Sequence, residues 1–201
     1  MKKLLGLIAA AGLMISAQGY DGVHLKKALE EKECIGCDLR GASLRNLDFS
    51  GGDFHGSDLS GADVRGSVFE MADLNDCNLS RAKAEGTVFW KASMERSNLR
   101  AIRAKGSNFK GTHLNKSDLS KADLRSAKIW KADLSDAILF QTDFRDAEIG
   151  GSKFIRNDLR TAKLEKSLLW QTRFSEVVMS KEQCAHAQKE EALLDSNVTC
   201  R

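Results

Sequence analysis

The closest pair of cysteines is the first feature whose spacing suggests chemistry. Cys34 and Cys37 form a Cys-x-x-Cys sequence, a spacing used by redox-active dithiols and by half of many zinc sites. A redox pair normally lies at the N-terminus of a helix, where the helix dipole lowers the thiol pKa. Here the pair follows a predicted helix, so the local field has the wrong sign. Zinc would need two further ligands, and the histidines are scattered: His24, His55, His113 and His186. We predict neither a redox centre nor a metal site.

Other arrangements that carry catalysis are also missing from the sequence. No Ser-His-Asp arrangement or nucleophile-elbow motif frames any of the serines. No glycine-rich loop opens a helix to hold a phosphate group. The sequence therefore predicts a protein that is not an enzyme, has no catalytic residues and needs no cofactor.

The three tryptophans have a regular spacing. Trp90, Trp130 and Trp170 are separated by forty residues each. Exposed aromatic side chains in a line are candidates for a binding surface. For the three side chains to lie in a line, the chain must contain a structural repeat whose length divides evenly into forty residues.

An unbroken five-residue repeat supplies that recurrence. Every fifth residue from Leu39 to Phe174 is of a type found in protein cores, over 28 pentads that span 37–176. In most pentads the central residue is Leu or Phe and a small residue lies two places before it. Asp or Asn precedes the central residue in 14 of the 28, as in Ala-Asp-Leu-Asn-Asp at 72–76. A fixed internal period decides the architecture before local propensity does.

A period of five fits neither a helix nor an ordinary strand. A chain that sends one side chain inward every five residues must turn a corner every five residues, so four pentads close a square coil of twenty. Seven such coils, stacked as parallel strands about 4.8 Å apart, would make a rod roughly 34 Å long. Every twentieth central residue then shares a face. The first face holds leucine alone: Leu39, Leu59, Leu79, Leu99, Leu119, Leu139 and Leu159. The chain has no proline, so every backbone N–H can pair.

This pattern resembles the pentapeptide-repeat family. The resemblance covers 140 of the 201 residues and implies an all-β fold, a right-handed quadrilateral parallel β-helix. It also implies that the central residue and the small residue two places before it point inward, while the other three face solvent. Each Asp or Asn before a central residue would then be a turn or strand-edge residue.

On this fold the tryptophans follow the central residue of the third face, on every second coil. Val68, Val88 and Leu168 precede central residues on the same face. Lysines lie among them: Lys91, Lys110, Lys128 and Lys131. The stripe of Trp90, Trp130, Trp170, Val68, Val88 and Leu168 is our candidate for self-association or for a protein partner. A glycan or another flat ligand is a further possibility, and so is a stacking ladder whose rings lysine stems cover. Phe140 and Ile155 are expected to stand alone on their faces.

The segment 1–19 has the pattern of a secretory signal peptide. Lys2 and Lys3 precede an apolar run from Leu4 to Ile15, and small residues follow. The run is short for a membrane span. Cleavage after Ala17 and cleavage after Gly19 both fit. We therefore expect an exported protein, periplasmic or otherwise extracytoplasmic, with no membrane attachment after cleavage.

Helical caps are predicted at both ends of the rod. The segment 20–36 holds a helix expected over Asp21–Glu33, with Asp21 as N-cap. Its apolar side is expected to hold Val23, Leu25, Ala28 and Leu29. The segment 177–201 begins a helix at a capping box, Ser180 to Gln183, and the helix is expected to run to about Ala192. An uncovered end would expose the core and unpaired ladder groups.

Five cysteines in an exported chain indicate disulfides with one thiol left over. We predict Cys34–Cys37 and Cys184–Cys200. The segment 32–39 also resembles the junction of cap and first coil in exported members of the family. Cys77 lies in the column of Cys37, but two coils away, about 9.6 Å, which is too far for a bridge. Cys77 is predicted to be a buried free thiol.

The charge balance narrows the class of partner. The formal net charge is +3, and loss of Lys2 and Lys3 with the signal lowers it to +1. Nothing in this balance calls for nucleic acid. We expect a non-enzymatic scaffold or binding module that presents one face to a protein partner. The alternative comes from cytoplasmic members of the family, which protect type II topoisomerases by mimicking DNA with an acidic dimeric rod. The signal and the near-neutral charge disfavour it.

Overall fold

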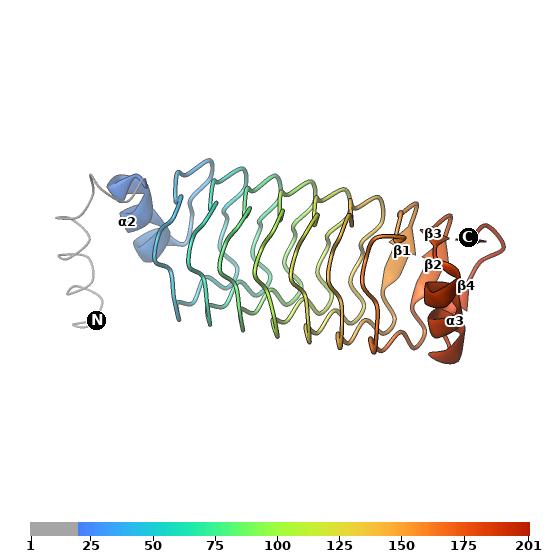
Figure 1. Cartoon of the computed structure of the whole chain (residues 1–201). Coiled ribbons are helices and arrows are strands. Elements are labelled where there is room, and N and C mark those ends of the chain that lie inside the picture. Colours follow the sequence, from blue (N-terminus) through green and yellow to red (C-terminus); the bar gives the residue numbers. More distant parts are fainter. Residues whose placement is uncertain (1–19) are drawn as a thin grey trace.

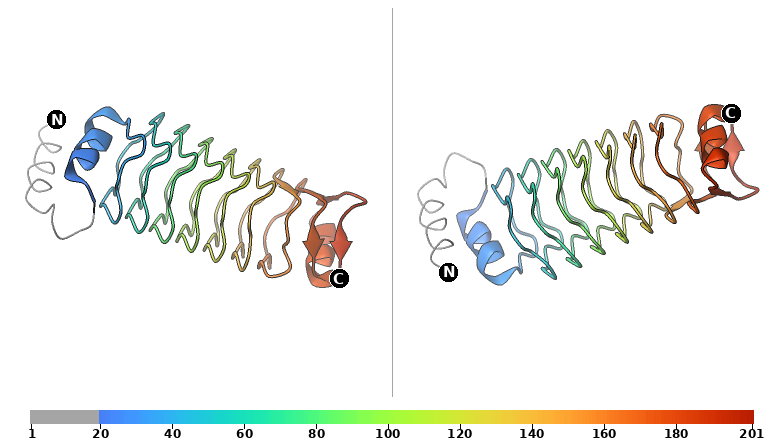
Figure 2. Two further views of the ribbon diagram at one scale, coloured as in Figure 1. Left: turned by 90° about the horizontal axis from the view of Figure 1, so that it is seen from above. Right: turned by 90° about the horizontal axis from the view of Figure 1, so that it is seen from below.

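The computed structural model describes residues 20–201, so the predicted signal segment 1–19 lies outside the described residues. The described chain is a stack of coils with a helix at each end (Figure 1). Two further views show that the helices lie at opposite ends of the stack (Figure 2). The helices and strands are α2 (Gly22–Glu31), β1 (Lys153–Ile155), β2 (Arg173–Ser175), β3 (Val178–Met179), α3 (Lys181–Lys189), β4 (Leu193–Leu194) and β5 (Thr199–Cys200).

Successive coils are joined by parallel bridges between residues twenty positions apart. Asp38 pairs with Asp58 and Asp58 with Asn78, and the same step recurs up to the pair of Asp158 with Val178. Most pairings are single bridges, and strands of two or three residues occur only at the C-terminal end. The chain turns every five residues, so each wall has room for little more than one ladder pair. The twenty-residue repeat is therefore present as the sequence indicates, although most walls pair through a single bridge and are too short to form strands.

A left-handed residue makes every corner but one. Gly41 has φ of 67°, and Asn46 has φ of 55°. The turn at the first corner closes where the Ala42 N–H donates to the Leu39 carbonyl at 3.0 Å. Left-handed residues recur every five positions from 36 to 176 except at Thr161, whose β-branched side chain disfavours that conformation. There the Gln141 N–H donates to the Thr161 hydroxyl at 3.0 Å in place of a backbone carbonyl.

Where Asp or Asn precedes a central residue, its side chain stabilises the wall locally. Asp58 Oδ1 accepts a hydrogen bond from the Ser60 N–H at 2.9 Å. The Asp118 carboxylate does the same for Ser120 at 2.8 Å. Short polar side chains that bond to a backbone N–H two residues on are typical of turns. Asp and Asn are abundant in this chain because they accept these backbone hydrogen bonds, as expected for turn or strand-edge residues.

The interior consists of the central residues and the small residues two places before them. Aromatic rings stack along the third face, with centroids 5.6 Å apart for Phe69 and Phe89 and 4.9 Å apart for Phe89 and Phe109. Buried hydroxyls donate to carbonyls 23 residues earlier, as Thr112 Oγ1 does to the Phe89 carbonyl at 2.8 Å. These bonds satisfy polar groups that would otherwise be costly to bury.

Helix α2 covers the N-terminal end. Asp21 is its N-cap and accepts from the Val23 N–H at 2.8 Å. The helix ends at Glu31, two residues earlier than expected, because Lys32 turns left-handed. Leu25 is buried against the first coil, but the placement of Val23 on the apolar side was wrong, since Val23 is exposed.

Helix α2 is also tied to the first coil by polar contacts. The Asp38 N–H donates to His24 Nδ1 at 3.0 Å, and the Asp21 N–H donates to the Asp38 carbonyl at 3.2 Å. These bonds replace partners that a preceding coil would have supplied. A disulfide joins Cys34 to Cys37, with an S–S distance of 2.12 Å, at the junction of helix and stack.

Helix α3 covers the C-terminal end. Its capping box is present: Ser180 Oγ accepts from the Gln183 N–H at 3.2 Å, and the Gln183 side chain accepts from the Ser180 N–H at 2.8 Å. The helix ends at Lys189, three residues earlier than expected. Strand β4 pairs with β2 in parallel, and β5 pairs with β3. The Cys184–Cys200 disulfide, with an S–S distance of 1.99 Å, ties the tail to the helix.

Candidate interaction surface

The third face presents its most exposed apolar side chains beside the C-terminal end of the stack. Leu168 and Trp170 flank the buried Leu169 and are 49% and 53% exposed. Side chains on either side of a central residue point away from the coil, so the two lie next to each other on the outer wall. Two large apolar groups side by side form a possible anchor for a partner.

Trp130, in contrast, is partly committed to contacts within the rod. Its indole N–H donates to Glu148 Oε2 at 2.8 Å. Its ring lies over Gly150, where an added Cβ would clash with the ring. The absence of a side chain at position 150 therefore makes room for the indole, and the half-buried Trp130 joins two coils. This contact had a visible signal in the sequence, because Gly150 follows Trp130 by twenty residues, which is one coil.

The remaining members of the stripe are also half-buried. Lys91 Nζ lies 4.6 Å from the Trp90 ring centroid, a cation–π contact. Val68 and Val88 are bridge partners on neighbouring coils. The structure thus brings the six predicted residues onto one side but divides them. Leu168 and Trp170 are open to a partner, and the other four cover the wall.

The first face carries an apolar pair that sequence reasoning missed. Ile138 and Phe140 are 55% and 48% exposed and flank the buried Leu139. The prediction that Phe140 stands alone on its face was wrong, because Ile138 occupies the place where this face otherwise has Asp or Asn. That departure from the repeat was the available signal. The two side chains line a hollow of about 450 Å³ together with Arg156, Arg160 and Thr161.

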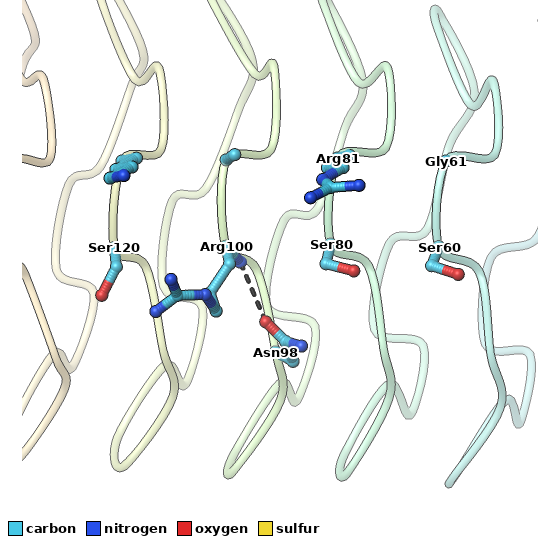
Figure 3. Close-up of a pocket in the computed structure, with 9 residues that line it drawn as sticks. Ser60, Gly61, Ser80, Arg81, Asn98, Arg100 and Ser120 are labelled. Carbon is cyan, nitrogen blue, oxygen red and sulfur yellow. Dashed lines mark hydrogen bonds between the residues drawn. The ribbon is translucent and has the colours of Figure 1, made fainter.

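A shallow trough crosses several coils of the same face. Figure 3 shows Ser60, Ser80, Arg100 and Ser120 in a row on successive coils, with Arg81 at the neighbouring corner. The trough has a volume of about 500 Å³, and its lining also includes Gly61, Asn98, Ala101 and Lys121. Short serine side chains make its floor. All its charged lining residues are cations, and we name it the first-face trough.

On the second face, carboxylates pair with arginines of the same face. Arg65 Nε donates to Asp63 Oδ1 at 2.8 Å, and Arg125 Nε donates to Asp123 Oδ1 at 2.8 Å. These hydrogen bonds hold the pKa of each carboxyl below its ordinary value. Carboxylates paired in this way have a structural role, and this face offers no unpaired cluster for chemistry.

Cys77 is buried, as its place in the repeat predicts. Its thiol donates to the Phe54 carbonyl at 2.9 Å, and burial raises its pKa to about 12. A thiol with so high a pKa is a poor nucleophile. Within residues 20–201 no three His, Cys, Asp or Glu side chains gather as metal ligands. No helix in this range has the length and apolar character to cross a bilayer.

A family model described as "Pentapeptide repeats" matches in 8 copies over residues 33–70, 72–111 and 105–141, more than half of the chain. No curated protein matches at a significant level.

Two solved structures share the architecture. The first is HetL from the cyanobacterium Nostoc sp. strain PCC 7120, a pentapeptide repeat protein involved in regulation of heterocyst differentiation. It is 20% identical, with a TM-score of 0.55 over 88% of this chain and 90% of HetL. The second is trypsin-treated QnrB1, a plasmid-mediated fluoroquinolone resistance protein, 17% identical, with a TM-score of 0.54 over 84% of this chain and 88% of QnrB1. These likenesses imply a right-handed quadrilateral β-helix.

Proposed function

The chain belongs to the pentapeptide-repeat family, and from this premise we propose that it is a non-enzymatic, extracytoplasmic binding module. The rod presents its third face to a protein partner or to a second copy of itself. The observation that carries the proposal is the exposed pair of Leu168 and Trp170. A wall hydrogen-bonded to neighbouring coils holds the pair in place, so little conformational entropy is lost when a partner binds.

The pair suits a small anchor within a larger contact. A specific protein interface usually buries about 800 Å² per partner, which is more than two side chains supply. The half-buried Trp130 and Trp90 lie further along the same face and extend the apolar area towards the N-terminal end. The exposed pair would then be the energetic centre, and the covered members of the stripe would add shape complementarity.

A photo-crosslinking residue in place of Trp170 tests this proposal in the cell of origin. We expect a discrete adduct, either with a second copy or with one protein that mass spectrometry identifies. Leu168→Glu in the same chain should abolish the adduct, because it adds a charge to the proposed contact. The control places the crosslinker at Met71, which is equally exposed at 57% but five coils away. An adduct that forms equally from both positions, or survives Leu168→Glu, contradicts the proposal.

Export is tested by the mass of the protein released by osmotic shock. Cleavage after Gly19 leaves Tyr20 as the first residue, and cleavage after Ala17 leaves Gln18. Thiol counting on the denatured, unreduced protein should find one free thiol, at Cys77. An uncleaved chain in the cytoplasmic fraction, or five free thiols, would contradict export.

The topoisomerase-protecting alternative remains a second candidate because QnrB1 shares the fold. A DNA mimic needs an acidic surface, and the arginines of this rod neutralise its carboxylates, as in Asp63–Arg65 and Asp143–Arg145. Fractionation separates the two candidates, because only a cytoplasmic protein can meet a topoisomerase. Recovery of the mature chain in the osmotic-shock fraction would rule out the alternative.

A further inference from the structure

The first-face trough departs from the charge pattern of the rest of the rod. At either end of this face, arginines are paired within their own wall: Arg40 Nε donates to Asp38 Oδ1 at 2.8 Å, and Arg160 Nε donates to Asp158 Oδ1 at 2.9 Å. In the middle, Asn78 and Asn98 stand where four of the other five coils have Asp, the exception being Ile138. Both amides can still bond to the backbone, as Asn98 does to the Arg100 N–H at 3.1 Å. The asparagines therefore preserve the turn and remove two negative charges.

Two of the three cations of the trough are left available as a result. Within residues 20–201, Arg81 and Lys121 make no ion pair, and Arg100 makes one, to Asp118 Oδ2 at 3.2 Å. Arg81 and Lys121 occupy corner positions two coils apart, about 9.6 Å, with Ala101 between them. A surface with unpaired charges of one sign attracts a partner of the opposite sign.

The exposed apolar pair of Ile138 and Phe140 lies at one end of the trough. Ile138 is the bridge partner of Asp118, and the Lys121 N–H donates to the Phe140 carbonyl at 2.8 Å. The exposed pair therefore lies one coil beyond Ser120. A purely anionic ligand, such as a nucleic acid or a sulfated glycan, has no use for two exposed apolar side chains at the end of its site. A polypeptide can supply carboxylates and an apolar side chain in one segment.

We propose that the first-face trough binds an extended acidic segment of a partner protein. Carboxylates of the segment lie against Arg81, Arg100 and Lys121, and a following large apolar side chain packs on Ile138 and Phe140. From Ser60 to Phe140 is four coil steps, about 19 Å, which an extended segment of about six residues spans. The serine floor leaves room for the segment's backbone. This face is opposite the third face, so both surfaces can be occupied at once.

Fluorescence anisotropy with a labelled peptide, Glu-Ser-Glu-Ser-Glu-Ser-Leu-Phe, tests the proposal on the purified protein. We expect binding at about 0.05 M salt that weakens strongly at about 0.5 M, because exposed charges are screened. The peptide with Gln in place of every Glu should not bind. Phe140→Ser should weaken the peptide that ends in Leu-Phe and leave a peptide that ends in Ser-Ser unaffected.

Two substitutions remove the cations without straining the fold. Arg81 and Lys121 have φ of 58° and 62°, a region that asparagine tolerates well. The double variant Arg81→Asn, Lys121→Asn should bind the acidic peptide about tenfold more weakly, the order expected for two exposed ion pairs. The matched control is Lys83→Asn, Lys105→Asn on the second face, which removes the same charge outside the trough. It should change the affinity by less than about twofold.

A gain of binding tests the same site in the opposite direction. Ala101 already has φ of 54°, so Ala101→Lys adds a cation between Arg81 and Lys121 without a new conformation. It should strengthen binding about threefold. Several outcomes would overturn the proposal: equal binding of the Glu and Gln peptides, an equal loss in the control double variant, or no gain from Ala101→Lys. Binding of a DNA oligonucleotide or heparin through Arg81 and Lys121, with no peptide binding, would also overturn it.

Discussion

The coil around Leu99 and the coil around Phe174 contain the same kinds of core residue but have different neighbours. The Leu99 N–H donates to the Asp118 carbonyl on one side, and the Asn98 N–H donates to the Cys77 carbonyl on the other, both at 2.8 Å. Both partners lie in coils of the same design. Phe174 has such a partner on one side only, Phe154, and on the other it meets Leu194 of β4.

The difference shows that the middle and the ends of the rod are stabilised in different ways. In the middle, each contact is one of a series, and the repeat supplies it automatically. At the ends, contacts that occur once take over: His24 with Asp38, Gln183 with the last coil, and the two disulfides. Substitutions in the middle should therefore act on the whole stack, whereas those at the ends should act locally.

The largest effect is expected in the middle of the stack. Leu99→Ala should lower the free energy of unfolding by about 2–5 kcal/mol, because the cavity lies between two packed coils. The comparison variant is Asp118→Ala, which loses the hydrogen bond from the Ser120 N–H at 2.8 Å and the ion pair with Arg100. It should cost about 1–2 kcal/mol. Urea unfolding measures both. Equal losses would contradict the assignment of inward and outward positions.

The C-terminal disulfide should have the next largest effect. Cys184 and Cys200 are 16 residues apart, and closing such a loop stabilises by about 3 kcal/mol in the chain-entropy model. Cys200→Ser should therefore expose residues 177–201 to hydrogen exchange and proteolysis while the middle coils stay protected. Loss of protection across all the coils would show that the cap controls the whole stack. The Cys34–Cys37 loop of three residues should contribute less, about 2 kcal/mol.

Gln183 should show how much a single polar contact contributes at an end. Its amide Nε2 donates to the Leu159 carbonyl at 2.7 Å and to the Ala162 carbonyl at 2.8 Å. Gln183→Ala removes both bonds and half of the capping box, so we expect a loss of about 2 kcal/mol from the C-terminal cap. The control is Gln188→Ala on the exposed side of the same helix, which should be nearly neutral. Hydrogen exchange of α3 measures both.

The smallest effect should come from the ion pairs along the walls. The pKa of Asp63 is lowered chiefly by its hydrogen bond with Arg65. A carboxyl whose pKa falls on folding contributes stability that is fully present above its unfolded pKa, about 3.9, and is lost as pH falls through the folded pKa. The urea midpoint should therefore decrease below about pH 4. Arg65→Gln should reduce this decrease, and a midpoint that rises on acidification would contradict the sign.

The middle of the rod was predictable because its determinants recur. The burial of Leu99 and the turn role of Asp118 follow from their positions in the pentad. Every coil repeats the same pentad pattern. The outcome for Cys77 follows in the same way, because its distance from Cys37 is a whole number of coils. In each case, position within the repeat was enough to place the side chain inside or outside.

The ends and the surface were less predictable, because single residues decide them. The bonds of Gln183 to the Leu159 and Ala162 carbonyls depend on how α3 lies on the last coil, and no periodicity encodes that. Three tryptophans at equal spacing suggested one stripe, yet Gly150 lets Trp130 lie against the wall while Trp170 stays exposed. The neighbour twenty residues on decides how far an outward side chain is covered.

The twenty-residue bridges also govern which changes of chain length the rod can accept. Insertion of one residue would move every later central side chain off the interior, because burial recurs only in fives. Insertion of five would keep burial but carry every later wall a quarter turn around the axis. Loss of five residues between Phe140 and Leu168 would place Leu168 and Trp170 on the second face. Only a change of twenty preserves every face, and it lengthens the rod by one coil, about 4.8 Å. The number of residues that precede a side chain therefore decides where it lies. Each five residues move it to the next face, and each twenty residues move it one coil along the rod.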